Sequence, residues 1–248
     1  MKILHIIPTL SPLAGGPTEV AINLVKHLNL LGAEAEILTT NDNGPTKYAF
    51  GLQQPISFRD VPVRFFNRID PRLNEFIISP SAVRWLSKNM YQYDILDIHY
   101  LFSYVPLMAR SMARKRKFPY TVRTMGQLSP WALQQSKWKK NLFFKWQEFK
   151  NLEKANALHS TSKLEEKDIR AFGLSPPVIN IPLGVQEHKR IDGATERIRK
   201  KYAITNDAFV ILFLSRLHPK KRPEVAIKVL ANLKKKIQRS FNYRRDWR

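Results

Sequence analysis

Gly15 and Gly16 are the first residues whose type and position could serve chemistry. They end a loop that follows an apolar run, and a helical pattern starts directly after them, with Pro17 in its first turn. A helix N-terminus presents unpaired N–H groups and a partial positive charge, and residues without a Cβ let an anionic ligand lie against the backbone. The Rossmann G-x-G-x-x-G and P-loop patterns are absent. A tight turn without a ligand therefore explains the two glycines equally well.

A basic loop near the end of the chain could also hold phosphate groups. Arg216, Lys220 and Lys221 follow the apolar run 209–214 and precede a helical pattern that begins at Pro223. Cations at the carboxyl end of a strand, beside a helix N-terminus, are well placed to bind a diphosphate. The alternative is an exposed basic loop without a ligand.

His99 ends the apolar run DILDIH. In open α/β sheets, ligands bind outside the carboxyl ends of the strands, so the position of His99 predicts a role at a site. The alternative is a histidine that only forms hydrogen bonds at a strand end. The six histidines are scattered and the sequence has no HExxH, G-x-S-x-G or D-x-D pattern, so we expect no metal site and no cofactor.

Buried runs alternate with amphipathic segments, and this alternation predicts the elements that position these residues. Ser162 and Glu165 have the spacing of a capping box at the start of one helix. The predicted strands are 2–8, 34–40, 61–66, 94–100, 118–124, 155–160 and 177–183, and the main helices are 17–31, 79–89, 103–117, 130–154 and 162–172. Such an order predicts an α/β fold with a doubly wound, Rossmann-like parallel sheet and the first strand inside it.

The composition changes after the last of these strands. We expect residues 1–185 to form one domain, 186–206 a polar linker, and 207–248 the first strand and helix of a second Rossmann-like domain. That strand is predicted at 209–214 and the helix at 223–236. From about 237 the chain is a basic tail without apolar periodicity. One strand and one helix cannot bury their apolar faces alone, so the second domain is expected to be incomplete.

The composition narrows the function classes. The 248 residues contain no cysteine, which excludes disulfides, thiolate zinc sites and cysteine nucleophiles and fits a cytoplasmic location. No signal peptide and no membrane-spanning apolar run is visible. The net charge of +22 favours phosphate-rich partners such as a nucleotide, anionic lipid or nucleic acid. Because the aromatic and lysine residues of 130–154 alternate, that helix fits either a membrane interface or a helix with one core face.

Five segments, in order, resemble the GT-B-fold glycosyltransferases of family four, also called group one. They cover nearly all of residues 1–236 and are KILHIIPTLSPLAGGPTEVAINLVKHLNLLG, DILDIHYLFSYVPLMAR, RTMGQLSPWALQQSKWKK, STSKLEEKDIRAFGLSPPVINIPLGV and FLSRLHPKKRPEVAIKVLANL. The resemblance implies an acceptor domain followed by a nucleotide-sugar domain. It also implies a retaining, metal-independent transfer to a saccharide or lipid-linked acceptor in polysaccharide biosynthesis. We expect a cytoplasmic location, with peripheral contact at the inner face of the cell membrane as an option.

The resemblance implies roles for the residues named above. Gly15 and Gly16 would line the cleft near the donor phosphates, and His99 would lie near the transferred sugar. Arg216 and Lys221 would neutralise the leaving diphosphate, where charge builds as the glycosidic bond breaks.

Two departures from the family pattern bear on activity. Arg222 stands where the family usually has glycine, and the paired-glutamate segment that holds the nucleotide sugar has no counterpart. We therefore expect this chain, by itself, to be a truncated and weakly active or inactive transferase. Two alternatives stay open: a basic binding module for nucleic acid or anionic membrane, although no nucleic-acid fold signature is present, and an acceptor-binding subunit that works with a separate donor subunit.

Overall fold

The computed structural model describes residues 1–49, 53–73, 76–134, 142–185, 191–215, 217 and 221–237. The chain divides into two compact units, Met1–Gly184 and Val185–Arg248. Each unit is described by itself below.

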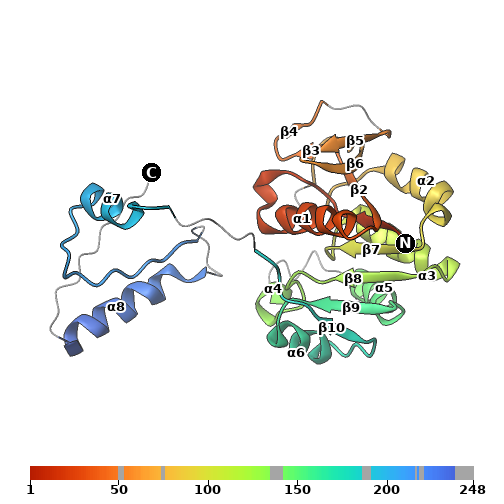
Figure 1. The fold of residues 1–248 in the computed structure, drawn as a ribbon. Coiled ribbons are helices and arrows are strands. Elements are labelled where there is room, and N and C mark those ends of the chain that lie inside the picture. Colours follow the sequence, from red (N-terminus) through yellow and green to blue (C-terminus); the bar gives the residue numbers. More distant parts are fainter. Residues whose placement is uncertain are drawn as a thin grey trace. The chain divides into compact units, whose positions relative to one another are not determined.

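The first unit is built on an eight-stranded sheet with the order β10-β9-β8-β7-β1-β2-β6-β5. β1 lies inside the sheet and pairs in parallel with β2 and β7, and only the edge strand β5 runs antiparallel to its neighbour. The strands are β1 (Lys2–Ile6), β2 (Glu34–Thr40), β5 (Pro55–Phe58), β6 (Val61–Phe66), β7 (Ile95–His99), β8 (Tyr120–Arg123), β9 (Ala157–Ser160) and β10 (Val178–Asn180). The predicted doubly wound parallel sheet with the first strand inside is confirmed (Figure 1).

Helices cover both faces of this sheet. Side chains of a strand alternate between its two faces, so Ile3 of β1 packs with α1 while Leu4 and Ile6 pack with α2, α3 and α5. The helices of the unit are α1 (Gly16–Leu30), α2 (Pro80–Asn89), α3 (Tyr104–Arg116), α4 (Pro130–Gln134), α5 (Leu142–Glu153) and α6 (Lys163–Ala171). Two buried apolar clusters, one on each face, form the core.

Local sequence signals fix the ends of these helices. The Ser79 hydroxyl accepts a hydrogen bond from the Ala82 N–H at 3.4 Å, and Pro80 occupies the first turn of α2. Gly15, with φ of 77°, is the N-cap of α1, and Gly32, with φ of 85°, follows the C-cap of the same helix. Both glycines hold left-handed backbone that other residues rarely adopt.

Several short elements escaped prediction because their sequences are polar and rich in turns. The region between β2 and β6 contains β3 (Asp42–Asn43) and β4 (Thr46–Lys47), which form a small hairpin, in addition to β5. The helix predicted at 130–154 is seen as α4 and α5, and the residues between them lie outside the described ranges. Two short 3₁₀ turns, Pro12–Ala14 and Met90–Gln92, complete the unit.

The second unit contains α7 (Ala194–Lys201) and α8 (Pro223–Ile237). The helix predicted at 223–236 is confirmed, whereas the polar linker predicted at 186–206 includes α7. The strand predicted at 209–214 is wrong: this segment has no regular secondary structure, and Leu212 and Leu214 are 79% and 86% exposed. Its composition favours a buried strand, but a strand needs a hydrogen-bonded neighbour and an apolar cover.

Within the described ranges, no helix is both long enough and apolar enough to cross a membrane.

The two-sided core predicts a sharp contrast between two leucines. Leu4 on β1 is fully buried, whereas Leu30 in the last turn of α1 is 74% exposed. We expect Leu4→Ala to lower the free energy of unfolding by about 2–5 kcal/mol, because it leaves a cavity. The control Leu30→Ala should change it by less than about 0.5 kcal/mol. Urea unfolding followed by far-UV circular dichroism measures both, and equal effects would contradict the assigned core.

Candidate functional site at the carboxyl edge of the sheet

His5, Asp97 and His99 form a buried cluster on one face of the sheet, near the carboxyl ends of β1 and β7. The register pairs His5 directly with Asp97, and His99 lies two residues farther along β7 on the same face. His5 Nδ1 is 3.1 Å from His99 Nε2 and 3.3 Å from an Asp97 carboxylate oxygen. His99 Nε2 is 3.7 Å from that same oxygen. The predicted site residue His99 therefore has two close partners from the sheet itself.

Asp97 is ionised at the centre of this cluster. The Arg123 Nε donates to one carboxylate oxygen at 2.8 Å, and the Thr121 hydroxyl donates to the other at 2.8 Å. Burial acts to raise the pKa of Asp97, but the hydrogen bond from His5 and the charge of Arg123 hold that pKa well below its ordinary value. The carboxylate is thus a permanent negative charge beside the two imidazoles.

His99 is neutral at physiological pH. The side chain is fully buried, and burial lowers its pKa from 6.5 to about 3, although the Asp97 carboxylate acts in the opposite direction. A positive imidazolium is disfavoured because the site offers little solvation. His99 therefore cannot act as a general acid near pH 7, but it can donate or accept a neutral hydrogen bond.

Donor atoms of this kind could also be ligands for a cation. The ligand atoms of His5, Asp97 and His99 all lie within 4.8 Å of one another. However, Arg123 already binds the carboxylate oxygen that faces both imidazoles, and its positive charge opposes a divalent cation there. The arrangement fits a hydrogen-bonded cluster better than a metal centre.

The loop that follows His99 has a strained backbone. Tyr100 and Phe102 have φ values of 71° and 50°, a region that bulky residues rarely adopt. The Leu101 N–H donates to the side-chain oxygen of Gln127 at 2.6 Å, and the Tyr100 N–H donates to the Arg123 carbonyl at 3.2 Å. Strained conformations of this type persist only where the surroundings impose them, and they are concentrated at functional sites.

A buried ion pair imposes part of this strain. Arg110 on α3 is fully buried and donates through Nε to Glu148 of α5 at 3.0 Å. The same guanidinium donates to the Tyr100 carbonyl at 2.6 Å, and the Glu148 carboxylate accepts the Phe102 N–H at 3.4 Å. Because both partners of the pair also bind the loop, α3 and α5 fix the backbone next to His99.

A second buried carboxylate fixes the loop after β8. Glu165 of α6 accepts hydrogen bonds from the Thr124 hydroxyl at 2.5 Å and the Gly126 N–H at 2.7 Å. Its other oxygen accepts the Thr161 N–H at 2.8 Å and the Thr161 hydroxyl at 2.7 Å. The predicted capping box is therefore only half right: Ser162 caps the N–H of Glu165, but the Glu165 carboxylate joins the loops after β8 and β9.

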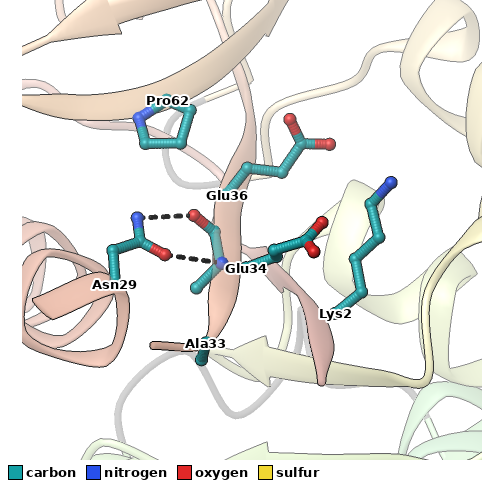
Figure 2. A pocket seen from close by; sticks show the side chains of 7 residues that line it. Lys2, Asn29, Ala33, Glu34, Glu36 and Pro62 are labelled. Carbon is teal, nitrogen blue, oxygen red and sulfur yellow. Dashed lines mark hydrogen bonds between the residues drawn. The ribbon is translucent and has the colours of Figure 1, made fainter. Parts of the chain in front are cut away.

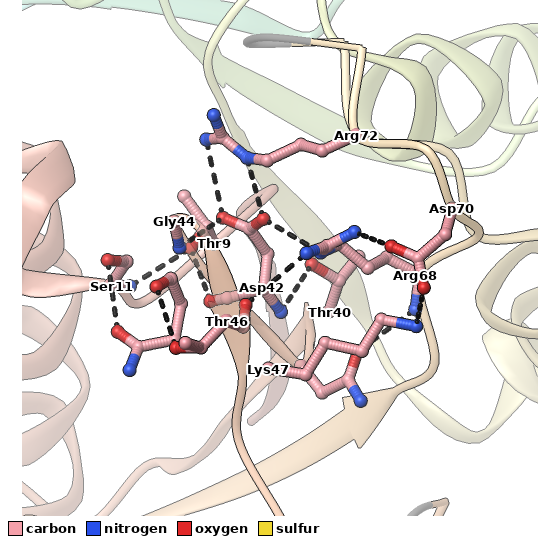
Figure 3. A network of polar contacts seen from close by, with 12 residues as sticks. Thr9, Ser11, Thr40, Asp42, Gly44, Thr46, Lys47, Arg68, Asp70 and Arg72 are labelled. Atoms are coloured by element: carbon pink, nitrogen blue, oxygen red, sulfur yellow. Dashed lines mark hydrogen bonds and ion pairs between the residues drawn. The ribbon is translucent and has the colours of Figure 1, made fainter.

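A third buried carboxylate, that of Asp42, joins the loops after β2 and β6 (Figure 3). Asp42 is fully buried, with Arg68 Nε at 3.0 Å and Arg72 Nε at 2.8 Å. The Thr9 hydroxyl donates to the Asp42 carbonyl at 2.9 Å, so the loop that leads to Gly15 belongs to the same network. Lys47 and Arg68 both pair with Asp70 at its margin.

The predicted glycines lie at this same edge, in the loop after β1. Gly15 needs its glycine for backbone reasons, since its φ is 77°. Gly16 is different: it is the first residue of α1, and an added Cβ would meet no atom within 4 Å. The open space beside Gly16 leaves room for a ligand at the helix N-terminus.

The predicted diphosphate-binding residues belong to the other unit. Arg216 lies outside the described residues, and Lys221 is exposed just before α8. The structure therefore brings Gly15, Gly16 and His99 to one edge of the sheet in the first unit, whereas Lys221 belongs to the second unit.

A cavity of about 290 Å³ lies at the opposite, amino edge of the sheet (Figure 2). Lys2, Glu34, Glu36 and Asn29 are among the residues that line it. The Asn29 side-chain amide forms two hydrogen bonds with the backbone of Ala35. Because ligands of open α/β sheets bind at the carboxyl edge, this cavity is not the candidate site.

Sequence reasoning missed His5, Asp97 and Glu148. Asp97 could have been found from the sequence. It lies two residues before His99 in the same predicted strand, so the two side chains share one face of that strand. His5 and Glu148 could not be connected to His99 from the sequence, because only strand order and helix packing bring them together.

The first unit has the Rossmann-like fold of GT-B glycosyltransferases. The profile described as Glycosyltransferase Family 4 matches residues 14–189. The chain belongs to this family. No curated protein gave a significant match to the chain.

Solved structures share the fold at low sequence identity. Anabaena HepE, in complex with UDP and glucose, is 17% identical with a TM-score of 0.63 over 94% of this chain. The sucrose-phosphate synthase of Thermosynechococcus elongatus is 15% identical with a TM-score of 0.61, also over 94% of this chain. The chain spans 58% and 60% of the lengths of these two proteins.

The four hydrogen bonds to Glu165 predict a large cost for removing its charge. Glu165→Gln turns an amide NH₂ toward groups that are themselves donors, and we expect the free energy of unfolding to fall by about 2 kcal/mol or more. The matched control is Glu166→Gln in the same helical turn, expected to change it by less than about 0.5 kcal/mol. Equal losses in the two variants would show that the hydrogen bonds to the Glu165 carboxylate do not stabilise the fold.

The pH dependence of this difference gives the same test a second readout. Burial acts to raise the pKa of Glu165, but the hydrogen bonds from Thr124, Thr161 and the Gly126 N–H lower it below 4.5. The Glu165 carboxylate therefore binds a proton more readily in the unfolded chain than in the folded one. Its contribution to the free energy of unfolding is complete above about pH 4.5 and is lost as the pH falls below that value. The gap between wild type and Glu165→Gln should narrow over that acid range.

Proposed function

We propose that this member of glycosyltransferase family 4 transfers a sugar from a nucleotide sugar to a saccharide or lipid-linked acceptor in polysaccharide biosynthesis. The transfer retains the anomeric configuration and needs neither a metal nor another cofactor. The reaction takes place in the cytoplasm, at the inner face of the cell membrane.

The observation that carries the proposal is the set of rigid loops at the carboxyl edge, within the residues that match the family profile. Rigid positioning of two substrates can supply about 7–11 kcal/mol of a reaction barrier, so an edge held by buried carboxylates suits a transferase. A nucleotide-sugar donor is supported by HepE, whose structure was solved with UDP and glucose.

In this proposal each predicted residue has one role. Gly15 and Gly16 let the ligand approach the N-terminus of α1, and His99 acts near the transferred sugar as a neutral hydrogen-bonding group. Arg216 and Lys221 neutralise the leaving diphosphate as negative charge builds on it.

We expect the chain, by itself, to be a slow enzyme or an inactive one. The described part of the second unit contains two helices and exposes the apolar segment 209–214, so it offers no built pocket for a nucleoside. Without a rigid grip on the donor, most of the benefit of positioning is lost.

The test is an assay of the purified chain with a panel of nucleotide sugars and candidate saccharide and lipid-linked acceptors. We expect product to form more slowly than about one turnover per second, with retained configuration and no effect of a chelator. His99→Ala should reduce the product, whereas the control His27→Ala, on the exposed surface of α1, should not. Circular dichroism checks that both variants fold.

Each other outcome has a meaning. Turnover at about one per second or faster would contradict the low activity. No product from the folded chain would agree with the expected inactivity of this chain alone and would favour the acceptor-binding subunit. Inhibition by the chelator would contradict the metal-independent reaction.

A basic surface supports peripheral contact with an anionic membrane. α3 packs between α2 and α5, and the exposed basic residues of these helices include Arg84, Lys88, Lys115, Arg116 and Lys150. Trp146 on α5 is 56% exposed, and the Lys150 ammonium lies 3.4 Å from the centre of its ring. Lysine and tryptophan together suit the headgroup region of a bilayer.

Sedimentation with vesicles of phosphatidylcholine and phosphatidylserine tests this contact. Each basic residue near an anionic surface contributes about 1 kcal/mol, so Lys88→Glu with Lys115→Glu should weaken binding about tenfold or more. The control pair Lys163→Glu and Lys167→Glu on α6 carries the same charge change and should weaken binding much less. Equal weakening, or equal binding to pure phosphatidylcholine, would contradict a specific membrane face.

A further inference from the structure

Only one ring nitrogen of each of His5 and His99 has a hydrogen-bond partner among the described residues. His5 Nδ1 and His99 Nε2 face each other at 3.1 Å. The other two ring nitrogens, His5 Nε2 and His99 Nδ1, are buried and have no hydrogen-bond partner among the described residues. A neutral imidazole carries one proton, so when both rings are neutral the pair has two protons for these four nitrogens.

Two proton arrangements satisfy the contact between the rings. In the first, His5 Nδ1 carries a proton and donates to His99 Nε2, so the His99 proton is on Nδ1. In the second, His99 Nε2 donates to His5 Nδ1, so the His5 proton is on Nε2. The nearby carboxylate distinguishes the two arrangements, because it attracts an N–H and repels a nitrogen lone pair.

Asp97 favours the first arrangement. Its oxygen is 3.3 Å from His5 Nδ1 but 3.7 Å from His99 Nε2, so the proton is held better on His5 Nδ1. Arg123 and Thr121 occupy the remaining positions around the carboxylate and keep it in place. Carboxylate, first imidazole and second imidazole thus form a chain in which each group sets the protonation of the next.

We propose that His5 and Asp97 are positioning residues that fix His99 as a neutral imidazole with its proton on Nδ1. His99 then offers one buried N–H donor at the end of β7, directly before the strained loop of Tyr100 and Phe102. The inference rests on the proposed function for its consequence, which is that a buried, uncharged imidazole supports the edge of the sheet where the sugar is proposed to bind. It assigns His99 the role of an uncharged donor rather than an acid or a base.

The test is ¹⁵N NMR of the full chain labelled in its histidine rings. Protonated and bare ring nitrogens differ widely in chemical shift, so the spectrum reports the tautomer directly. The signals of His99 are identified by their loss in His99→Gln. In wild type we expect a protonated Nδ1 and a bare Nε2 for His99.

The wild-type pattern should not change between about pH 5 and 8. The groups that face His99 are His5, Asp97, Arg123 and His159. Burial lowers the pKa of His99 more than the Asp97 carboxylate raises it. A His99 protonated on Nε2, or a charged His99 at neutral pH, would overturn the proposal without any variant.

Two substitutions at His5 separate positioning from a purely structural role. His5→Phe keeps a ring but removes the donor, so His99 should shift to the form protonated on Nε2, where the Asp97 oxygen is 3.7 Å away. His5→Asn retains an N–H donor and should restore the wild-type pattern of His99. His27→Gln, on the exposed α1 surface, is the matched control and should leave the His99 signals unchanged.

An unchanged His99 pattern in a folded His5→Phe chain would overturn the proposal. If that variant does not fold, the wild-type spectrum and His5→Asn still decide the question. The spectrum needs no substrate, so a failure of sugar transfer with the expected tautomer would count against the proposed function and leave the positioning role intact.

Discussion

Buried carboxylates hold the carboxyl edge of the sheet, and the candidate site depends on them. A buried charge is costly unless several donors satisfy it, so each carboxylate draws donors from neighbouring loops. The Asp42 carboxylate joins the loops after β2 and β6, Glu148 fixes the loop after β7, and Glu165 joins the loops after β8 and β9. Tyr100 and Phe102 have positive φ angles in a loop that Arg110 and Glu148 hold by hydrogen bonds.

The cluster around Asp97 uses the same physical principle in a different way. Its negative charge is balanced by Arg123, and burial keeps His99 neutral, so His99 lies beside a fixed anion and a fixed cation. His99 does not change its charge near neutral pH. It suits recognition of hydroxyl groups more than proton transfer, which agrees with a proposed role next to a sugar.

The two units of the chain differ in how much of their apolar surface is buried. The first unit buries apolar side chains on both faces of β1, whereas the second exposes Phe209, Leu212 and Leu214. The chain also spans only 58% of the length of HepE and 60% of that of the sucrose-phosphate synthase. Family membership and fold therefore rest on the first unit, and donor binding stays a proposal.

The sequence by itself determined the alternation of strands and helices, because periodicity and caps such as Ser79 and Gly32 act locally. It also placed His99 at a strand end. Only the tertiary structure decided that His5 meets Asp97, since the pairing of β1 with β7 joins residues 92 positions apart. Glu165 looked like a cap because its distant partner Thr124 was invisible locally, and 209–214 looked like a strand because propensity cannot supply the neighbours a strand requires.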